Sequence, residues 1–319
     1  MKVVIAPDGF GGTLSAAEAT RAIAEGWQSA RPVDTLVTMP MSDGGEGFLD
    51  VVARPGDVHV TCEVTDPHGR PIDATIMIRG STAIIEAARA CGLMLLDVDE
   101  RDPRRTTTFG VGQLLAAARA RGVERIVLGV GGSATVDGGA GALTGLGFRV
   151  RRADGSGLKI GGGELVAVDR VDAGWAPSFD GIAVDVLADV DIPLDAAAAM
   201  FGPQKGADAE AVADLDRSIR RWADVAERDL AGGAGVRATA GAGAAGGLAF
   251  GLACGIGARI SAGAAAVTEL VGLDAALATA DAVVTGEGQI DATSFHGKVV
   301  GEIRERAMAG GLAFGAVVG

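Results

Sequence analysis

The amino-acid sequence predicts an α/β fold, and two patterns carry this prediction. Short apolar runs recur along the chain, and each stops at an acidic residue beside glycine or proline. Five such runs end at Asp8, Asp43, Asp137, Asp189 and Glu287. An apolar run of this length bounded by turn residues is typical of a strand that is buried on both faces. Segments with helical spacing lie between several of the runs, as expected for parallel α/β sheets.

The first part of the chain alternates between strands and helices. Residues 2–6 form the first predicted strand, and Thr13 or Ser15 can cap a helix that runs through Trp27. Residues 36–39 form the second strand, and a helix follows the glycine turn at residues 44–47. This order is typical of βαβ units.

The pattern changes near residue 58. Three short β-like runs at residues 58–64, 71–78 and 82–87 are joined by polar turns, which predicts antiparallel strands. We therefore place a lobe boundary at this point. We expect a discontinuous lobe made of residues 1–58 and 267–319, and an inserted lobe made of residues 59–266.

The remaining elements continue the α/β pattern. Helices are predicted at residues 114–118, 208–230, 264–270 and 302–309, and strands at residues 126–130, 182–190, 282–284 and 312–319. Residues 240–258 carry no charge and are long enough to span a bilayer. They are mostly Gly and Ala, so we predict a buried helix and no membrane partner. A final strand without a following helix is unusual, and we expect the natural chain to continue past Gly319.

The charge, the cysteines and the N-terminus indicate which partners and which cellular compartment to expect. The net charge of −13 argues against nucleic acid, because neutralising phosphates requires a basic face. The three cysteines Cys62, Cys91 and Cys254 lack C-x-x-C spacing, and the N-terminus lacks the pattern of a signal peptide. We therefore expect reduced thiols and a cytoplasmic protein. A homodimer is compatible with these features.

Lysine usage singles out two residues. The chain has 28 basic residues, but only Lys2, Lys159, Lys205 and Lys298 are lysines. A composition so biased towards arginine predicts that a lysine inside a glycine-rich motif is needed as a compact ammonium. Lys205 and Lys298 meet this condition and are candidates for contacting a phosphate. The alternative is a surface lysine or a residue at a helix start.

The acidic residues at the predicted strand ends suggest a phosphoryl-transfer site. In open α/β sheets, ligands bind outside the carboxyl ends of the strands. Phosphoryl transfer needs Mg²⁺ held by carboxylates, a base for the attacking hydroxyl and cations for the transferred charge. The alternative is ordinary turn chemistry and helix capping. Five occurrences beside glycine-rich loops favour a functional role for at least three of these acids.

Two glycine-rich segments match dinucleotide-binding patterns weakly. GVGGSA at residues 129–134 follows a predicted strand, and GAGAAG at residues 241–246 does not. The first is followed about 20 residues later by arginines, where a dinucleotide-binding protein has an acid that holds the ribose. Loops that donate N–H groups to an anion remain a reasonable interpretation of both. The three histidines are too scattered for a metal cluster.

Several motifs in order resemble the bacterial type I glycerate kinase family. They are VVIAPD at residues 3–8, LSAAEA at 14–19, SDGGEG at 42–47, GVGGSATVDGGAG at 129–141, FGPQKGA at 201–207, GAGAAGG at 241–247, and TGEGQID with HGK at 285–298. The resemblance implies a flavodoxin-like parallel-sheet lobe and an inserted mixed α/β lobe with a cleft between them. It also implies a cytosolic enzyme that phosphorylates D-glycerate with ATP and Mg²⁺, and 2-phosphoglycerate is favoured over 3-phosphoglycerate as the product.

The chain departs from the family pattern in its first loop and near residue 192. The family usually has serine and lysine where this chain has Gly9 and Gly11, and asparagine where this chain has Ile192. The loop before FGPQKGA is also shortened. We expect these changes to affect substrate contacts and not the fold.

These inferences give a hypothesis for each predicted site residue. Asp189 or Asp191 acts as the base, and Lys205 and Lys298 stabilise the transferred phosphoryl charge. The predicted Mg²⁺ ligands are Asp189, Glu287 and Asp291. Nucleotide contacts are expected from Asp8, Gly131, Gly132, Ser133, Gly243, Gly246 and Glu287. Substrate contacts are expected from Asp43, Gly44, Gly45, Glu46 and Asp137. The rival hypotheses are an NAD-type oxidoreductase built on GVGGSA, and a non-catalytic hydroxy-acid or nucleotide sensor that keeps the fold.

Overall fold

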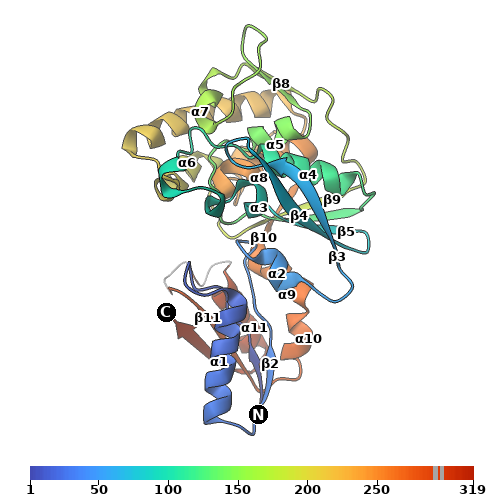
Figure 1. Cartoon of the computed structure of the whole chain (residues 1–319), viewed down its shortest axis with the longest axis vertical. Helices are drawn as coiled ribbons and strands as arrows, with labels where there is room; N and C mark the ends of the chain where they lie inside the picture. Colours follow the sequence, from blue (N-terminus) through green and yellow to red (C-terminus); the bar gives the residue numbers. More distant parts are fainter. Residues whose placement is uncertain (290–293, 295–297) are drawn as a thin grey trace. The chain divides into compact units, whose positions relative to one another are not determined.

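The computed structural model describes residues 1–289, 294 and 298–319 and confirms the mixed α/β class (Figure 1). The chain divides into two compact units. Unit 1 comprises Met1–Arg54 and Ala262–Gly319, and unit 2 comprises Pro55–Ser261. The boundaries expected at residues 58 and 267 remain a proposal about domain organisation. None of the described helices combines the length and the apolar character needed to cross a membrane.

Unit 1 is built on a parallel sheet in the order β12-β11-β1-β2 among the described residues. Its elements are β1 (Lys2–Ile5), α1 (Ala16–Ala30), β2 (Thr35–Thr38), α2 (Phe48–Val52), α9 (Gly263–Val271), α10 (Leu273–Leu277), β11 (Ala282–Glu287), α11 (Val299–Gly310) and β12 (Ala313–Val318). Numbered within unit 1 alone, this order is 2-1-3-4, which is how flavodoxin-like sheets begin. Val3 of β1 pairs with Leu36 on one side and with Ala282 on the other, so β1 joins segments from both ends of the chain.

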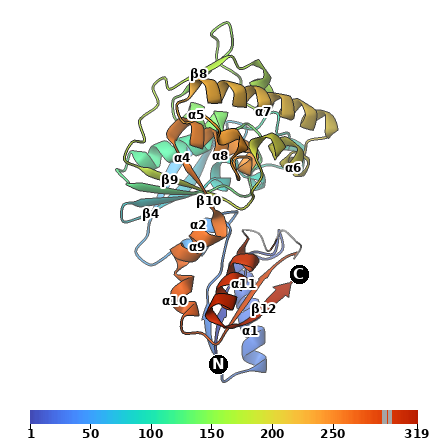
Figure 2. The same cartoon turned by 180° about the vertical axis from the view of Figure 1, so that it is seen from behind.

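Helices cover both faces of the unit 1 sheet. α1 lies in front of the sheet in Figure 1 and behind it in Figure 2, whereas α11 does the reverse. On the α1 face, Ile23 and Trp27 pack against alternate sheet residues such as Ile5. Ser15, not Thr13, caps α1. Its hydroxyl accepts from the Glu18 N–H and its own N–H donates to the Glu18 carboxylate, at 3.3 and 2.9 Å, which forms a capping box.

Unit 2 contains a mixed sheet in the order β10-β9-β6-β5-β4-β3. Its elements are β3 (Val58–Thr65), β4 (Pro71–Arg79), β5 (Thr82–Glu86), α3 (Ala88–Cys91), α4 (Phe109–Arg119), β6 (Arg125–Gly129), α5 (Ala140–Gly145), β7 (Arg149–Arg151), β8 (Arg170–Asp172), β9 (Ala183–Ala188), α6 (Ala197–Phe201), α7 (Ala209–Asp229), α8 (Ala244–Ile256) and β10 (Arg259–Ala262). The prediction of antiparallel strands is confirmed for β3, β4 and β5. β5, β6 and β9 then pair in parallel, as in an α/β sheet.

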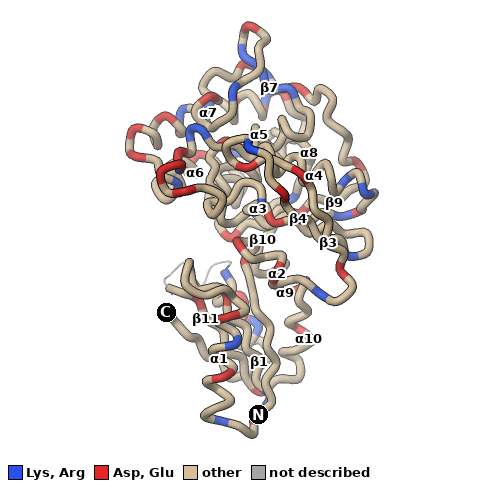
Figure 3. Tube along the Cα trace, viewed as in Figure 1, with Lys and Arg blue, Asp and Glu red and all other residues tan. Residues whose placement is uncertain are grey.

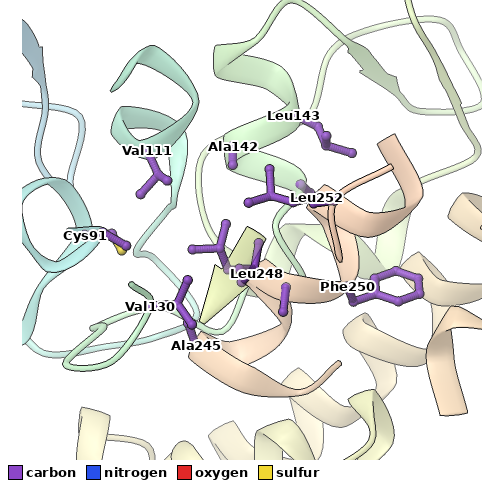
Figure 4. Close-up of a cluster of buried hydrophobic side chains, with 14 of the residues drawn as sticks. Cys91, Val111, Val130, Ala142, Leu143, Ala245, Leu248, Phe250 and Leu252 are labelled. Carbon is purple, nitrogen blue, oxygen red and sulfur yellow. The ribbon is translucent and has the colours of Figure 1, made fainter. Parts of the chain in front are cut away.

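The core of unit 2 is packed mainly from aliphatic side chains and glycine. Figure 4 shows Val111 of α4, Leu143 of α5 and Leu248 of α8 within one buried cluster. Glycine lets these helices approach each other closely. A Cβ built on Gly112 of α4 would lie 2.1 Å from the Ala142 carbonyl oxygen of α5, which leaves no room for any other residue.

Three parts of unit 2 test the sequence prediction in detail. The charged helix predicted at residues 208–230 is confirmed as α7, which Asp208 caps and which carries both signs of charge along its length (Figure 3). The buried helix predicted at residues 240–258 is confirmed only from Leu248 onwards. Residues 245–247 have positive φ and break the helical path. The small antiparallel pair β7–β8 was not predicted.

Candidate active site

Charged residues gather at the carboxyl edge of the unit 1 sheet. Glu287 is the last residue of β11. Asp8 follows β1, and its N–H donates to the Gly286 carbonyl at 2.9 Å, which places it beside the end of β11. Asp43 follows β2, the neighbour of β1. The fold therefore brings three predicted acids to one sheet edge, because parallel strands all end there.

The SDGGEG loop holds Asp43 in a tight turn. The Gly44 N–H donates to the Ser42 hydroxyl at 3.1 Å, and the Gly45 N–H donates to Asp43 Oδ1 at 3.1 Å. Gly44 has a φ of 98°, a conformation that glycine adopts readily. The loop also packs on the start of α9, where a Cβ on Gly263 would lie 1.7 Å from the Asp43 carbonyl oxygen. The sequence motif predicted this loop, but nothing in it indicated the contact with Gly263.

Asp43, Glu287 and Lys298 form an electrostatic cluster in unit 1. Loss of solvent raises the pKa of Asp43 above its usual range; Lys298 opposes this rise and Glu287 adds to it. Glu287 is only 8% exposed, and among the described residues no group donates a hydrogen bond to its Oε1 atom. A buried carboxylate oxygen without a donor is costly, and a bound cation would compensate for the missing hydrogen bond. Lys298 lies immediately before α11 and is half-buried.

Lys205 is the central charged group of unit 2. It is 2% exposed and ends a short 3-10 helix, Pro203–Lys205, within the FGPQKGA motif. Its Nζ atom donates to the Ser133 hydroxyl and to the Thr135 carbonyl, both at 2.8 Å. No described Asp or Glu pairs with it within 4.0 Å. Burial lowers its pKa to about 8, while Cys91 and Asp137 act in the opposite direction. A buried ammonium held by neutral groups is prepared to meet an anion.

Asp137 fixes the loop that holds Lys205. Its carboxylate accepts from the N–H and hydroxyl of Thr108 at 2.8 and 2.9 Å, from the Thr107 hydroxyl at 3.3 Å, and from the N–H groups of Gly139 and Gly141 at 3.1 and 3.2 Å. Burial raises its pKa, and these hydrogen bonds oppose the rise. In this structure the carboxylate supports the loop, and the predicted substrate contact stays a prediction. Sequence reasoning missed the three threonines at 106–108, whose only signal was their position before a helix.

The glycines of the second glycine-rich segment are buried where backbones cross. A Cβ on Gly246 would lie 2.1 Å from the Thr135 carbonyl oxygen, and one on Gly243 would lie 2.7 Å from the Pro193 carbonyl oxygen. The Gly138 N–H also donates to the Gly246 carbonyl at 2.9 Å. Packing thus explains why glycine is needed at these positions. Their predicted contact with a nucleotide is not tested by this geometry.

The other predicted residues occupy varied environments. Asp189 directly follows β9 and is half-buried, and Asp191 is exposed. Glu46 is exposed, as is Gly132, whose φ of 71° shapes the loop after β6 together with its half-buried neighbour Gly131. Asp291 lies outside the described residues. His296 does as well.

In the described part of the chain, a divalent cation could be held by a pair of carboxylates. Within residues 1–289, 294 and 298–319, no group of three or more His, Cys, Asp or Glu side chains is arranged to hold a metal ion. Mg²⁺ commonly needs only one or two carboxylates when phosphates supply further oxygens. Within unit 1, the carboxylates of Asp43 and Glu287 interact, and Oε1 of Glu287 has no hydrogen-bond partner in the described part of the chain, so this pair meets the requirement. The predicted role of Asp189 as a ligand stays a prediction.

Comparison with known proteins gives one consistent result. The sequence profile of the glycerate kinase family matches residues 3–319. The chain is similar to the glycerate kinase of Bacillus subtilis (strain 168), with 43% identity over 306 residues that cover 93% of this chain and 79% of that protein. It is also similar to the glycerate 2-kinase of Escherichia coli (strain K12), with 38% identity over 306 residues that cover 94% and 80% of the two chains.

A solved structure agrees with these sequence relatives. The crystal structure assigned to glycerate kinase 2 of Salmonella typhimurium LT2 superimposes on this chain with a TM-score of 0.85 and 38% sequence identity. The match covers 100% of this chain and 86% of that one. The similarity therefore extends over both units.

Proposed function

This chain belongs to the glycerate kinase family, and we propose that it transfers the terminal phosphoryl group of ATP to a hydroxyl of D-glycerate, with 2-phosphoglycerate as the product. The observation that carries the proposal is the buried ammonium of Lys205, which forms no ion pair with the described residues. A kinase needs such a positive charge to stabilise the negative charge on the phosphoryl group during its transfer. Membership of a kinase family removes the basis for the oxidoreductase hypothesis.

We assign to Lys205 the stabilisation of negative charge on the transferred group. Its two hydrogen bonds hold the ammonium in place, and burial removes the water that would weaken its interaction with an anion. An incoming phosphate would supply the opposite charge that the ammonium lacks. Ser133 and the glycines before it lie on the same loop, and their backbone N–H groups are candidates for further phosphate contacts.

We assign to the unit 1 cluster the binding of the cation and of the substrate. Glu287 and Asp43 would hold Mg²⁺, which when bound neutralises phosphate charge. Asp8 shares this sheet edge. Lys298, next to Asp43, would pair with a carboxylate or phosphate of the reactants. Asp189 or Asp191, after β9, remain the candidates for accepting the proton of the attacking hydroxyl.

The decisive experiment is an assay of ADP release from Mg-ATP with and without D-glycerate. We expect ADP only in the presence of D-glycerate. Adding enolase alone identifies the product, because enolase dehydrates 2-phosphoglycerate directly, whereas 3-phosphoglycerate must first be isomerised by a mutase. L-glycerate serves as the matched control. No ADP with D-glycerate, despite nucleotide binding, would contradict the proposed reaction and favour the sensor hypothesis.

A further inference from the structure

Unit 2 contains a charged cavity whose lining includes none of the residues that we assign to the proposed reaction. Its volume is about 940 Å³, which lies within the range of small-molecule sites. Four of its lining residues are cationic, namely Arg104, Arg105, Lys159 and Arg217, and two are acidic, namely Glu164 and Asp214. Figure 3 shows basic residues on the β7 and α7 side of unit 2. This concentration is unusual in a protein with a net charge of −13.

Two of these cations lack an ion-pair partner among the described residues. Asp214 pairs with Arg217, and Glu164 pairs with Arg152 outside the cavity. Arg104 pairs with Asp102 at 3.0 Å. Among the described residues, the side chains of Arg105 and Lys159 form no hydrogen bond and no ion pair within 4.0 Å, although the charge of Arg105 helps to lower the pKa of Asp102. The cavity therefore presents two positive charges without an ion-pair partner among the described residues, one from the segment before α4 and one from the glycine-rich loop at residues 157–163.

The lining also includes apolar surface. Ile160 is 50% exposed and Val166 is 55% exposed, and both face the cavity as lining residues. Exposed aliphatic side chains next to unpaired cations suit a ligand that combines anionic groups with a carbon body. Arginine binds phosphate and carboxylate in the same forked manner, so the chemistry on the page specifies an organic anion with either group.

Residues adjacent to the cavity lining contact the loop that holds Lys205. The Gly163 N–H donates to the Arg104 carbonyl at 3.0 Å, and a Cβ on Gly162 would lie 2.0 Å from the Val136 carbonyl oxygen. The Thr106 hydroxyl donates to the Ala134 carbonyl at 2.9 Å. Ordering of Arg105 or Lys159 by a ligand would thus act on backbone that contacts residues 134–137 directly.

From these contacts we infer that the cavity is a binding site for a small organic anion with at least two phosphate or carboxylate groups, and that its occupancy is sensed by the loop at residues 133–139. The inference does not depend on the proposed reaction, because binding is measured without substrate. Trp222 supplies a reporter, since its Nε1–H donates to the Gly138 carbonyl at 2.9 Å and its side chain is fully buried.

The test is a titration of the full chain with citrate and, separately, with pyrophosphate, at constant ionic strength and without Mg²⁺. Calorimetry measures binding, and a variant with Trp27→Phe and Trp175→Phe isolates the fluorescence of Trp222. We expect saturable binding of at least one probe, accompanied by a change in Trp222 fluorescence. The probe that binds more tightly tells whether the site prefers carboxylate or phosphate groups.

The double variant Arg105→Gln/Lys159→Gln should bind the probe about tenfold more weakly or worse, because two charge-assisted contacts are removed. Both residues are exposed, so the fold should be unaffected. Arg121→Gln, an exposed arginine outside the cavity, is the matched control and should bind as the parent does. Unchanged affinity in the double variant, or no binding of either probe, would overturn the site; binding without a fluorescence change would overturn the coupling to the loop.

Discussion

Unit 1 and unit 2 each collect charge where strands of a parallel α/β arrangement end, but they do so with opposite chemistry. Unit 1 gathers carboxylates, with Asp43 and Glu287 close enough to interact, and no group in the described part of the chain donates to Oε1 of Glu287. Unit 2 buries a single ammonium, Lys205, among neutral oxygens. An unsatisfied carboxylate oxygen suits a cation, and an unpaired ammonium suits an anion. This contrast is the basis of our proposal that unit 1 binds the metal ion and unit 2 binds the phosphate.

Lys205→Met should produce the largest effect. We expect kcat to fall by about 10² to 10³, the loss typical when one preorganised donor to a developing anion is removed. Steady-state ADP release measures the change, and circular dichroism verifies the fold. Lys2→Met is the matched control, because Lys2 begins β1, at the opposite end of that strand from the carboxyl edge, and its half-buried side chain donates to the Thr279 hydroxyl. Near-normal turnover in Lys205→Met would end the assignment of phosphate chemistry to unit 2.

Asp137→Asn should show whether Asp137 stabilises the fold of unit 2 or contacts the substrate. The donors that converge on this carboxylate would meet an amide with one acceptor oxygen, so we expect the free energy of unfolding to fall by about 2 kcal/mol. Urea denaturation measures this loss. Asp180→Asn, at an exposed turn, should change little. An Asn variant as stable as the parent, yet with a KM for glycerate raised tenfold or more, would instead support the predicted substrate contact of Asp137.

Glu287→Gln should weaken metal use without removing phosphate binding. The variant keeps the size of the side chain but loses its charge, and we expect the Mg²⁺ concentration for half-maximal activity to rise about tenfold, equivalent to about 1.4 kcal/mol. A Mg²⁺ titration of ADP release provides the measurement. Glu25→Gln, on the exposed side of α1, is the control. If Glu287→Gln left the Mg²⁺ dependence unchanged and weakened nucleotide binding alone, the division of labour between the units would be wrong.

The pH dependence of kcat and of stability should differ in sign if Lys205 has the proposed role. The folded pKa of Lys205 is lowered to about 8 from 10.5, so between these values the unfolded chain binds more protons than the folded one. The contribution of this group to the free energy of unfolding therefore rises with pH across that window. The charge needed for catalysis is lost over the same window, so kcat should fall above about pH 8 while stability does not. We would measure kcat and Tm over the same pH range. If both fell together above about pH 8, unfolding and not the loss of the Lys205 charge would explain the lost activity.

Much of the fold could be predicted because the signals are local. Apolar runs and turn residues located β1, β6, β9 and β11, and the alternation at residues 58–87 located three antiparallel strands. The break at residues 245–247 could not be predicted in this way. It arises because Gly246 and Gly247 cross the backbone of residues 135–138, which lies far away in sequence.

The candidate site was predictable in its residue types more than in its contacts. Scarcity of lysine pointed to Lys205, and strand ends pointed to Asp43 and Glu287. The partners of these groups come from segments that are distant in the sequence. No local pattern could therefore predict that Lys205 donates to Ser133 and Thr135. The same is true of the hydrogen bond that Thr108, just before α4, donates to Asp137. In the first loop, where the chain departs from the family pattern, there is space for a side chain at Gly11, because a Cβ built there would meet nothing within 4 Å.

The pairing of β1 with β11 also sets the order in which the protein can form during synthesis. β1 emerges first from the ribosome, yet its partner β11 begins at Ala282. Unit 2 is continuous over Pro55–Ser261 and can complete its core while β11 and β12 do not yet exist. Until they arrive, β1 and β2 form at most a two-stranded fragment, which is marginally stable in water. β1 therefore stays without its β11 partner until residues 282–287 have been made, and an unpaired strand edge of this kind favours aggregation.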